Sequence, residues 1–146
     1  MTSSKATPPL SLAPETSPDD ATIRTIEAGL NGYSASLGIV GDWSPHWIIG
    51  RDTEGAVQAG IRFVVVFEWL FVNWLWVAEP HRKHGIGSQL MASAEAAARE
   101  RHCRAAYLDT FTFQAPKFYA RLGYREFGRL NDFPPGHARI WFWKSL

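Results

Sequence analysis

Hydrophobic and polar positions change their spacing along this chain, and the changes predict an order of strands and helices. From residue 46, three runs rich in β-branched and aromatic residues follow one another, separated by short turn sequences. Such runs are typical of neighbouring antiparallel strands. We place the strands at His46–Arg51, Ala56–Phe67 and Trp69–Val77, with a hairpin turn at Asp52–Gly55.

The apolar spacing becomes helical after the third strand. A helix is predicted from about Gly85 to Glu100, with apolar residues recurring at three- and four-residue intervals. The expected core face is Ile86, Leu90, Ala94 and Ala97/Ala98, and the expected solvent face is Glu95, Arg99 and Glu100. The next strand, Ala105–Thr110, is predicted to run parallel to Trp69–Val77, because a helix crosses between them.

The C-terminal part reads as one short helix and two strands. Pro116 suits a first helical turn, and Gly123 is placed to end that helix. Strands are predicted at Tyr124–Gly128 and Ala138–Lys144, joined by a loop at residues 132–136.

The N-terminal part is less regular. Residues 1–20 are rich in Ser, Thr and Pro, which predicts a flexible tail, and residues 21–146 are expected to form a single domain. Alternating β-branched residues predict a short strand at Thr22–Ile26. A helix is expected at Glu27–Leu37, ending at Gly38.

Composition narrows the class of protein. The 146 residues are 46% hydrophobic and carry a net charge of +1, so overall charge indicates neither a nucleic-acid-binding surface nor disorder. The longest apolar run, Phe63–Ala78, is interrupted by Glu68 and Asn73, and we expect no membrane span. A lone cysteine, Cys103, and the lack of a basic start followed by an apolar run favour a reducing compartment, the cytoplasm.

The richest chemistry lies in the turn between the third strand and its following helix. Backbone N–H groups at the start of a helix are unpaired and carry partial positive charge. Here Gly85 and Gly87 leave that backbone accessible, and His81 to His84 add cationic side chains. The sequence therefore predicts a site for a diphosphate-like anion. The phosphate-loop and dinucleotide-binding motifs both fail, because Ser88 and Leu90 stand where a lysine and a third glycine are required.

The pattern that fits is Arg82-x-x-Gly85-x-Gly87 directly after a strand ending in Trp-Val. It resembles the coenzyme A pyrophosphate loop of the GCN5-related N-acetyltransferase (GNAT) family. A second stretch, Ala115-x-x-Phe118-Tyr119-x-x-Leu122-Gly123-Tyr124, resembles another signature of the same family. The two signatures occur in the family's order, and the resemblance extends over residues 22–146.

The resemblance implies a mixed α+β fold: a mostly antiparallel central sheet with flanking helices and one parallel strand pair that splays apart. Acetyl-coenzyme A would lie in the gap. Its pantetheine arm would bond the backbone of Leu75, Trp76 and Val77, and Phe118 and Thr112 would also contact it, although relatives often carry Asn at the position of Thr112. The backbone of the loop would hold the pyrophosphate, through Arg82, Lys83, His84, Gly85, Ile86, Gly87 and Ser88.

Tyr119 matches the family's general acid, which protonates the departing thiolate. A tyrosine hydroxyl suits this role because it stays protonated at neutral pH. The implied activity is transfer of an acetyl group from acetyl-coenzyme A to a primary amine of a small molecule or peptide. A non-catalytic acyl-coenzyme A sensor and a nucleotide-binding protein remain alternatives. No motif fixes a general base, for which the candidates are Glu27, Glu68, Glu79 and Asp109.

Other conspicuous residues have plainer interpretations. His81 and His84 lack further ligands at metal spacing, so no metal site is expected, and Cys103 is expected to be an inert thiol. The tryptophans of the third strand, Trp69, Trp74 and Trp76, are expected in the core. Trp43, Trp47, Trp141 and Trp143 are expected to pack, with a substrate cleft or a homodimer interface as alternatives, and the last strand is the candidate dimer surface.

Overall fold

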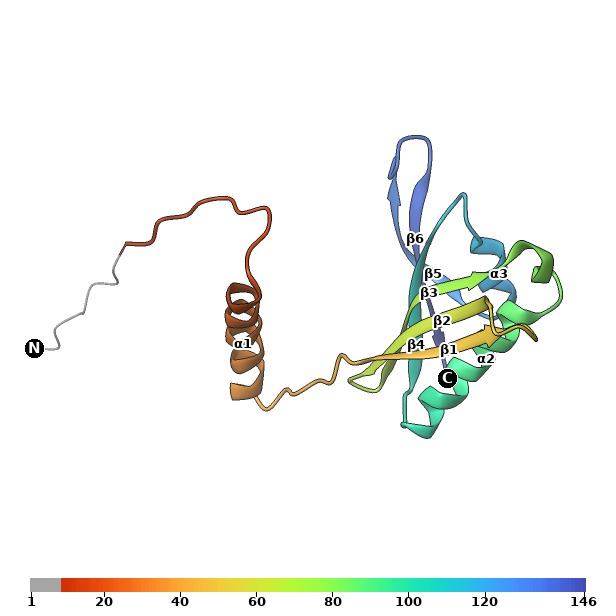
Figure 1. The fold of residues 1–146 in the computed structure, drawn as a ribbon, viewed down its shortest axis with the longest axis horizontal. Coiled ribbons are helices and arrows are strands. Elements are labelled where there is room, and N and C mark those ends of the chain that lie inside the picture. The colour runs from red at the N-terminus through yellow and green to blue at the C-terminus, as the bar shows by residue number, and fades with distance from the viewer. Residues whose placement is uncertain (1–8) are drawn as a thin grey trace, which may run out of the picture. The chain divides into compact units, whose positions relative to one another are not determined.

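The computed structural model describes residues 9–146 (Figure 1). Contacts divide the chain into two units between Val40 and Gly41. The elements, in chain order, are α1 (Asp20–Ser36), β1 (Pro45–Arg51), β2 (Val57–Val66), β3 (Trp69–Val77), a 3₁₀ turn (Glu79–His81), α2 (Ile86–Glu100), β4 (Ala105–Phe111), α3 (Pro116–Arg121), β5 (Arg125–Asn131) and β6 (Ala138–Ser145).

The first unit contains one helix, and the predicted strand at Thr22–Ile26 is wrong. The Asp19 side chain accepts a hydrogen bond from the Thr22 N–H at 2.7 Å and so caps α1 at its N-terminus. The β-branched Thr25 fits the helix because its hydroxyl donates to the Ala21 carbonyl. The cap and this bond outweigh the weak strand preference of a five-residue run. The helix ends as expected, with Gly38 at a φ of +74°.

Residues 9–19, which precede α1, contain no helix or strand. The first eight residues of the predicted tail lie outside the described residues. No helix within residues 9–146 is both long and apolar enough to cross a lipid bilayer.

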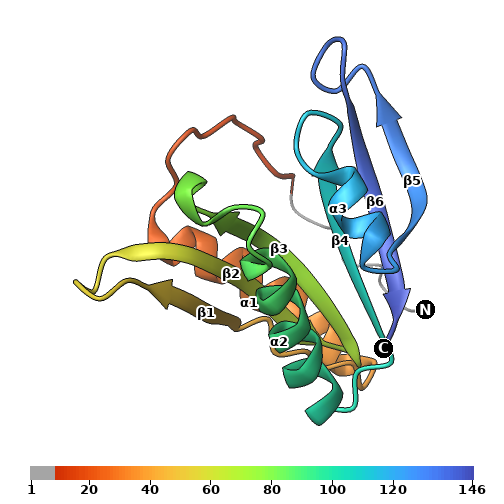
Figure 2. The same cartoon turned by 90° about the vertical axis from the view of Figure 1, so that its right-hand side faces the viewer.

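The second unit is built on a six-stranded sheet with the order β1-β2-β3-β4-β6-β5. All neighbouring strands are antiparallel except β3 and β4, which run parallel. Figure 2 shows α2 crossing in front of β1–β3, and α3 in front of β4 and β6. The mixed, mostly antiparallel sheet with flanking helices is the predicted fold.

The parallel pair splays apart as predicted. β3 and β4 pair only from Trp69 with Ala105 to Val72 with Leu108, although both strands continue further. The cause is visible on the other edge of β3, where Arg62 pairs with Trp74 and Phe63 with Val72. Asn73 is therefore an extra residue, a β-bulge, and a bulge bends its strand. The bend directs the end of β3 away from β4.

Only one face of the β1–β3 half is covered by α2, and this corrects the prediction that the tryptophans of β3 are core residues. Leu70 and Val72 are buried under the helix, whereas Trp74 is 63% and Trp76 50% exposed. Side chains alternate between the two faces of a strand, so the apolar run serves two different environments. On the opposite face, the Arg62 guanidinium lies 5.2 Å from the centre of the Trp74 ring.

Glu95 is buried, not solvent-facing as predicted. Its Oε1 accepts from the Tyr124 hydroxyl at 3.0 Å, and the Lys144 ammonium donates to both carboxylate oxygens at 3.0 and 2.9 Å. Arg99 adds a longer contact of 3.3 Å. The carboxylate connects α2, which covers β1–β3, to the β4-β6-β5 half, so it holds together the two parts of the sheet that the splay separates.

We expect Glu95→Ala to lower the free energy of unfolding by about 3 kcal/mol, because it removes one partner of a buried ion pair and leaves a tyrosine hydroxyl without its acceptor. Urea denaturation measures the change. The control is Glu100→Ala, which removes an exposed carboxylate from the same helix and should change stability by less than about 0.5 kcal/mol. Equal effects of the two substitutions would contradict the anchoring role of Glu95.

Candidate active site

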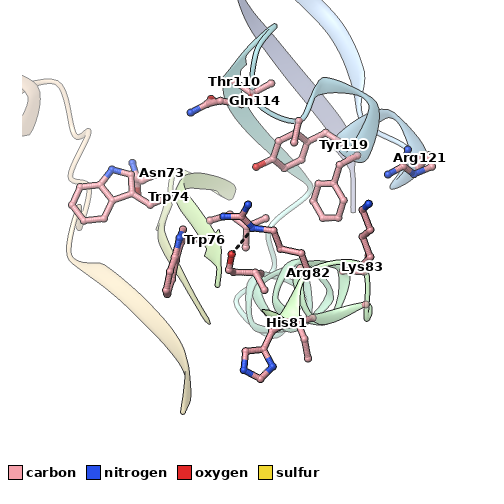
Figure 3. A pocket seen from close by; sticks show the side chains of 18 of the residues that line it. Asn73, Trp74, Trp76, His81, Arg82, Lys83, Thr110, Gln114, Tyr119 and Arg121 are labelled. Carbon is pink, nitrogen blue, oxygen red and sulfur yellow. Dashed lines mark hydrogen bonds between the residues drawn. The ribbon is translucent and has the colours of Figure 1, made fainter. Parts of the chain in front are cut away.

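A cavity of about 850 Å³ opens where β3 and β4 separate (Figure 3). Its walls come from the end of β3, the loop and first turn of α2, the end of β4, and α3. The lining residues are Asn73, Trp74, Leu75, Trp76, Val77, His81, Arg82, Lys83, Gly85, Ile86, Gly87, Ser88, Asp109, Thr110, Phe113, Gln114, Ala115, Phe118, Tyr119 and Arg121. The pairing gap in the sheet is therefore a true cleft.

The loop before α2 forms the basic end of this cleft. Gly85 precedes the helix at a φ of +82°, a conformation that glycine adopts without strain, and a Cβ there would meet nothing within 4 Å. No side chain caps the helix at this end. The first N–H groups of α2 therefore have no side-chain partner among residues 9–146, so the predicted anion site stays a prediction that the geometry allows.

Arg82 ties this loop to the end of β3. Its Nε donates to the Val77 carbonyl at 2.9 Å, and the side chain also lines the cleft (Figure 3). The guanidinium has further N–H groups beyond that bond. Together with His81, Lys83 and Arg121, it makes this part of the lining strongly cationic.

Gly87 lines the cleft and also has a packing role that the sequence does not predict. A Cβ at this position would stand 3.3 Å from the Phe118 ring, which is tighter than ordinary contact. The glycine therefore allows α3 to pack against the start of α2. Close packing here brings the two family signatures together at one end of the cleft.

Tyr119 is held rigidly by its short helix. After α3, Gly123 adopts a φ of +88°, the Gly123 N–H donates to the Ala120 carbonyl, and the Tyr124 N–H donates to the Tyr119 carbonyl. This pair of bonds is a Schellman ending, and it fixes the C-terminus of α3. The Tyr119 ring packs on Phe118 and Tyr124, and only 8% of the residue is exposed.

The Tyr119 hydroxyl points into the cleft (Figure 3), and no group in residues 9–146 forms a hydrogen bond with it. Burial, followed by the nearby negative charge of Asp109, raises the pKa of Tyr119 to about 12. The hydroxyl therefore stays protonated at neutral pH, as a proton donor must.

The cleft gathers eleven of the thirteen predicted site residues, all except His84 and Thr112. Thr112 lies beyond the end of β4 and faces β6 instead, where its hydroxyl accepts from the Ala138 N–H at 3.0 Å. The position facing the cleft is Thr110, whose hydroxyl bonds to the Gln114 side chain at 3.1 Å. Gln114 also accepts from the Phe111 N–H, which fixes the turn after β4.

Three of the candidate bases, Glu68, Glu79 and Asp109, belong to the same unit as the cleft. Of these, only Asp109 lines it. Glu68 is an exposed residue in the β2–β3 turn and pairs with Arg104 at 3.7 Å. Glu79 is exposed in the 3₁₀ turn. The fourth candidate, Glu27, belongs to the other unit, in α1.

Several lining residues carried no sequence signal. Asn73 and Trp74 sit at the bulge, and a bulge is not visible in an unbroken apolar strand. Phe113, Gln114 and Arg121 belong to the β4–α3 turn and to α3, and they are not among the signature residues of this stretch. Within residues 9–146, no three His, Cys, Asp or Glu side chains are grouped as a metal site requires.

The sequence model of the acetyltransferase (GNAT) family matches residues 12–124. The blasticidin-S acetyltransferase of Streptomyces morookaense is 45% identical over 84 residues, which are 57% of this chain and 62% of that protein. The chain thus spans less than two thirds of the length of this curated relative.

Solved structures agree in fold. A crystal structure of an acetyltransferase from Bacillus cereus superimposes with a TM-score of 0.80 at 32% identity, covering 92% of this chain and 98% of that one. A Bacillus anthracis crystal structure, described as a streptothricin acetyltransferase candidate in complex with acetyl-coenzyme A, has a TM-score of 0.62. It covers 75% of this chain and 67% of its own, and at 17% identity it shows likeness of fold alone.

We expect Arg82→Ala to raise the Kd for coenzyme A about tenfold, because a guanidinium–phosphate bond is among the stronger charge-assisted hydrogen bonds. Isothermal titration calorimetry measures the change. Arg51→Ala is the matched control, since Arg51 is an exposed arginine of the β1–β2 hairpin and does not line the cleft. An unchanged Kd in Arg82→Ala would place the anion elsewhere.

Proposed function

Because this chain belongs to the GNAT acetyltransferase family, we propose that it transfers the acetyl group of acetyl-coenzyme A to a primary amine of a small molecule or peptide. One observation carries the proposal. A single cleft joins a basic loop at a helix N-terminus to a protonated, unpartnered tyrosine hydroxyl, across an unpaired stretch of sheet. Acyl transfer from a coenzyme A thioester needs these three features: the basic loop for the pyrophosphate, the unpaired strand for the pantetheine arm and the hydroxyl for the departing thiolate.

The cleft suits the shape and charge of the coenzyme. In the proposed complex the free N–H groups at the start of α2, with Arg82 and Lys83, hold the pyrophosphate. Beyond Val72, the edge of β3 that faces β4 has no strand partner, so the backbone of Leu75 to Val77 is available to bond the amides of the pantetheine arm. The thioester then lies near Tyr119.

The reaction needs little beyond positioning and one proton donor. The acceptor amine first loses a proton to solvent, and its neutral nitrogen attacks the thioester carbonyl, so a C–N bond forms and the C–S bond breaks as the tetrahedral intermediate collapses. Tyr119 donates its proton to the departing sulfur, and water returns a proton to the phenolate. The surplus proton of the nitrogen passes to solvent.

The relative that acts on blasticidin S, at 45% identity, supports a small-molecule acceptor, and blasticidin S is the first amine to test. The cytoplasm is the proposed compartment. Its reducing environment suits the single cysteine, Cys103, which is buried and free.

A screen of amines with acetyl-coenzyme A, read by release of free thiol, tests the proposal. Turnover with any amine separates an enzyme from the alternative, a non-catalytic acyl-coenzyme A sensor. Tight binding of acetyl-coenzyme A with no thiol release from any amine would overturn the proposal in favour of the sensor.

We expect Tyr119→Phe to lower kcat about 100-fold or more, because loss of a general acid typically has this effect, while the Kd for acetyl-coenzyme A stays within about twofold. Steady-state kinetics and calorimetry measure the two quantities. Tyr107→Phe is the matched control: that ring stacks on Phe71, 4.5 Å between centres, outside the cleft lining. Full activity in Tyr119→Phe would remove its proposed role.

The raised pKa of Tyr119 also gives a pH dependence. The neutral hydroxyl is favoured in the folded state, so its contribution to stability is complete below the ordinary pKa of about 10 and is lost as pH rises towards about 12. We expect wild type and Tyr119→Phe to differ in unfolding free energy by a constant amount from pH 7 to 9. Above pH 10 the wild type should lose stability relative to the variant in urea denaturation.

A further inference from the structure

Asn73 lines the cleft and carries an unusual group. Its Oδ1 is buried and has no hydrogen-bond partner, and it is the single side-chain N or O atom of this kind found in residues 9–146. A buried carbonyl without a donor costs free energy, so native proteins seldom keep one. The atom belongs to a residue that lines the cleft, where a bound molecule can supply the missing N–H.

Asp109 faces the same space from the other strand. Val72 and Leu108 are the last paired residues of β3 and β4, so Asn73 and Asp109 are the first residue on each strand beyond the pairing. Both line the cleft. The topology thus places a carbonyl acceptor and a carboxylate on the two sides of the point where the sheet opens.

The Asp109 carboxylate is held in place, but in residues 9–146 only one of its two oxygens has a hydrogen-bond partner. Its Oδ2 accepts from the Arg139 Nε at 2.7 Å, and the side chain is 17% exposed. Arg139 in turn lies against the rings of Phe111 and Trp141, at 5.5 and 5.1 Å, and does not line the cleft. No bond to the second oxygen, Oδ1, is formed within the described residues.

The two ends of the cleft differ in the charge of their side chains. Asp109 is the one acidic residue of the lining, whereas His81, Arg82, Lys83 and Arg121 are basic. Figure 3 shows Asn73 and Trp74 on one side of the cavity and Lys83 and Arg121 on the other, with Tyr119 between them. The basic side suits a phosphate-bearing ligand, and the Asn73–Asp109 side suits a donor of N–H groups.

We propose that Asn73 and Asp109 form the acceptor pocket, in which Asn73 Oδ1 and Asp109 Oδ1 accept hydrogen bonds from the reacting amine. This inference rests on the proposed acetyltransfer and names the part of the cleft that recognises its second substrate. Two oxygen acceptors, one of them anionic, select a primary amine that is protonated in solution over a hydroxyl or a neutral amide.

The test compares Asn73→Ala and Asp109→Asn with wild type, using the best amine from the screen. We expect each variant to raise the KM for the amine at least tenfold and to leave the KM for acetyl-coenzyme A within twofold. Asn131→Ala and Asp42→Asn are matched controls on exposed positions outside the lining, and both should behave as wild type.

A stability measurement separates recognition from a structural role. Asn73 Oδ1 has no bond to lose, so Asn73→Ala should fold with an unchanged or higher Tm. This variant keeps the proposal testable if Asp109→Asn, which releases Arg139, folds poorly.

Three results would overturn the proposal. An unchanged amine KM in Asn73→Ala would remove the residue from the acceptor pocket. A raised KM for acetyl-coenzyme A in place of the amine KM would assign Asn73 Oδ1 to the pantetheine arm. A wild type that binds acetyl-coenzyme A but acetylates no amine would defeat the proposed function, and the acceptor pocket with it; an active wild type with unaffected variants would defeat the pocket alone.

Discussion

The structure depends on one interruption of backbone pairing. β3 and β4 form a parallel ladder for four residue pairs, and the bulge at Asn73 then bends β3 out of it. Continued pairing would satisfy the backbone groups at the ends of both strands and leave no room between them. The interruption exposes backbone hydrogen-bonding groups along the edge of β3 and opens the cleft. The site therefore exists because β3 and β4 do not pair along their full length.

A sheet with so short a junction needs other connections between its halves. α2 packs on β1–β3, and Glu95 reaches from this helix to Lys144 on β6 and to Tyr124 before β5. Phe118 closes against Gly87 at the other end of α2. One helix therefore presents its uncapped N-terminus to the cleft at one end, packs against the tyrosine-bearing helix there, and is anchored further along by the Glu95–Lys144 ion pair. The relative placement of loop and tyrosine follows from these contacts.

Much of this arrangement was readable from the sequence. The strands from β1 to β6, the parallel pair, the basic loop and Tyr119 follow from period-two and helical spacing, from glycine positions and from two family signatures. Two of the errors share a physical cause, because the surroundings of these residues are set by parts of the chain that are distant in sequence. Sequence patterning predicts Glu95 to face solvent because it does not show that Lys144 lies beside it, and it predicts Trp74 to be core because it does not show that α2 covers only the other face of β3. The strand predicted at Thr22–Ile26 failed for a local reason. The hydrogen bond from the Thr22 N–H to the Asp19 side chain caps a helix there and outweighs the strand preference of the β-branched residues.

The contact between Gly87 and Phe118 has a consequence for how such a protein can vary. The two positions come from different signatures, 31 residues apart, yet they share one small volume, with only 3.3 Å between a notional Cβ and the ring. A larger residue 87 would require the Phe118 ring, and with it the neighbouring part of α3, to shift, unless residue 118 shrank in compensation. The residue sizes at the start of α2 and in α3 are therefore set jointly, and substitutions at the two positions are expected to be tolerated as pairs.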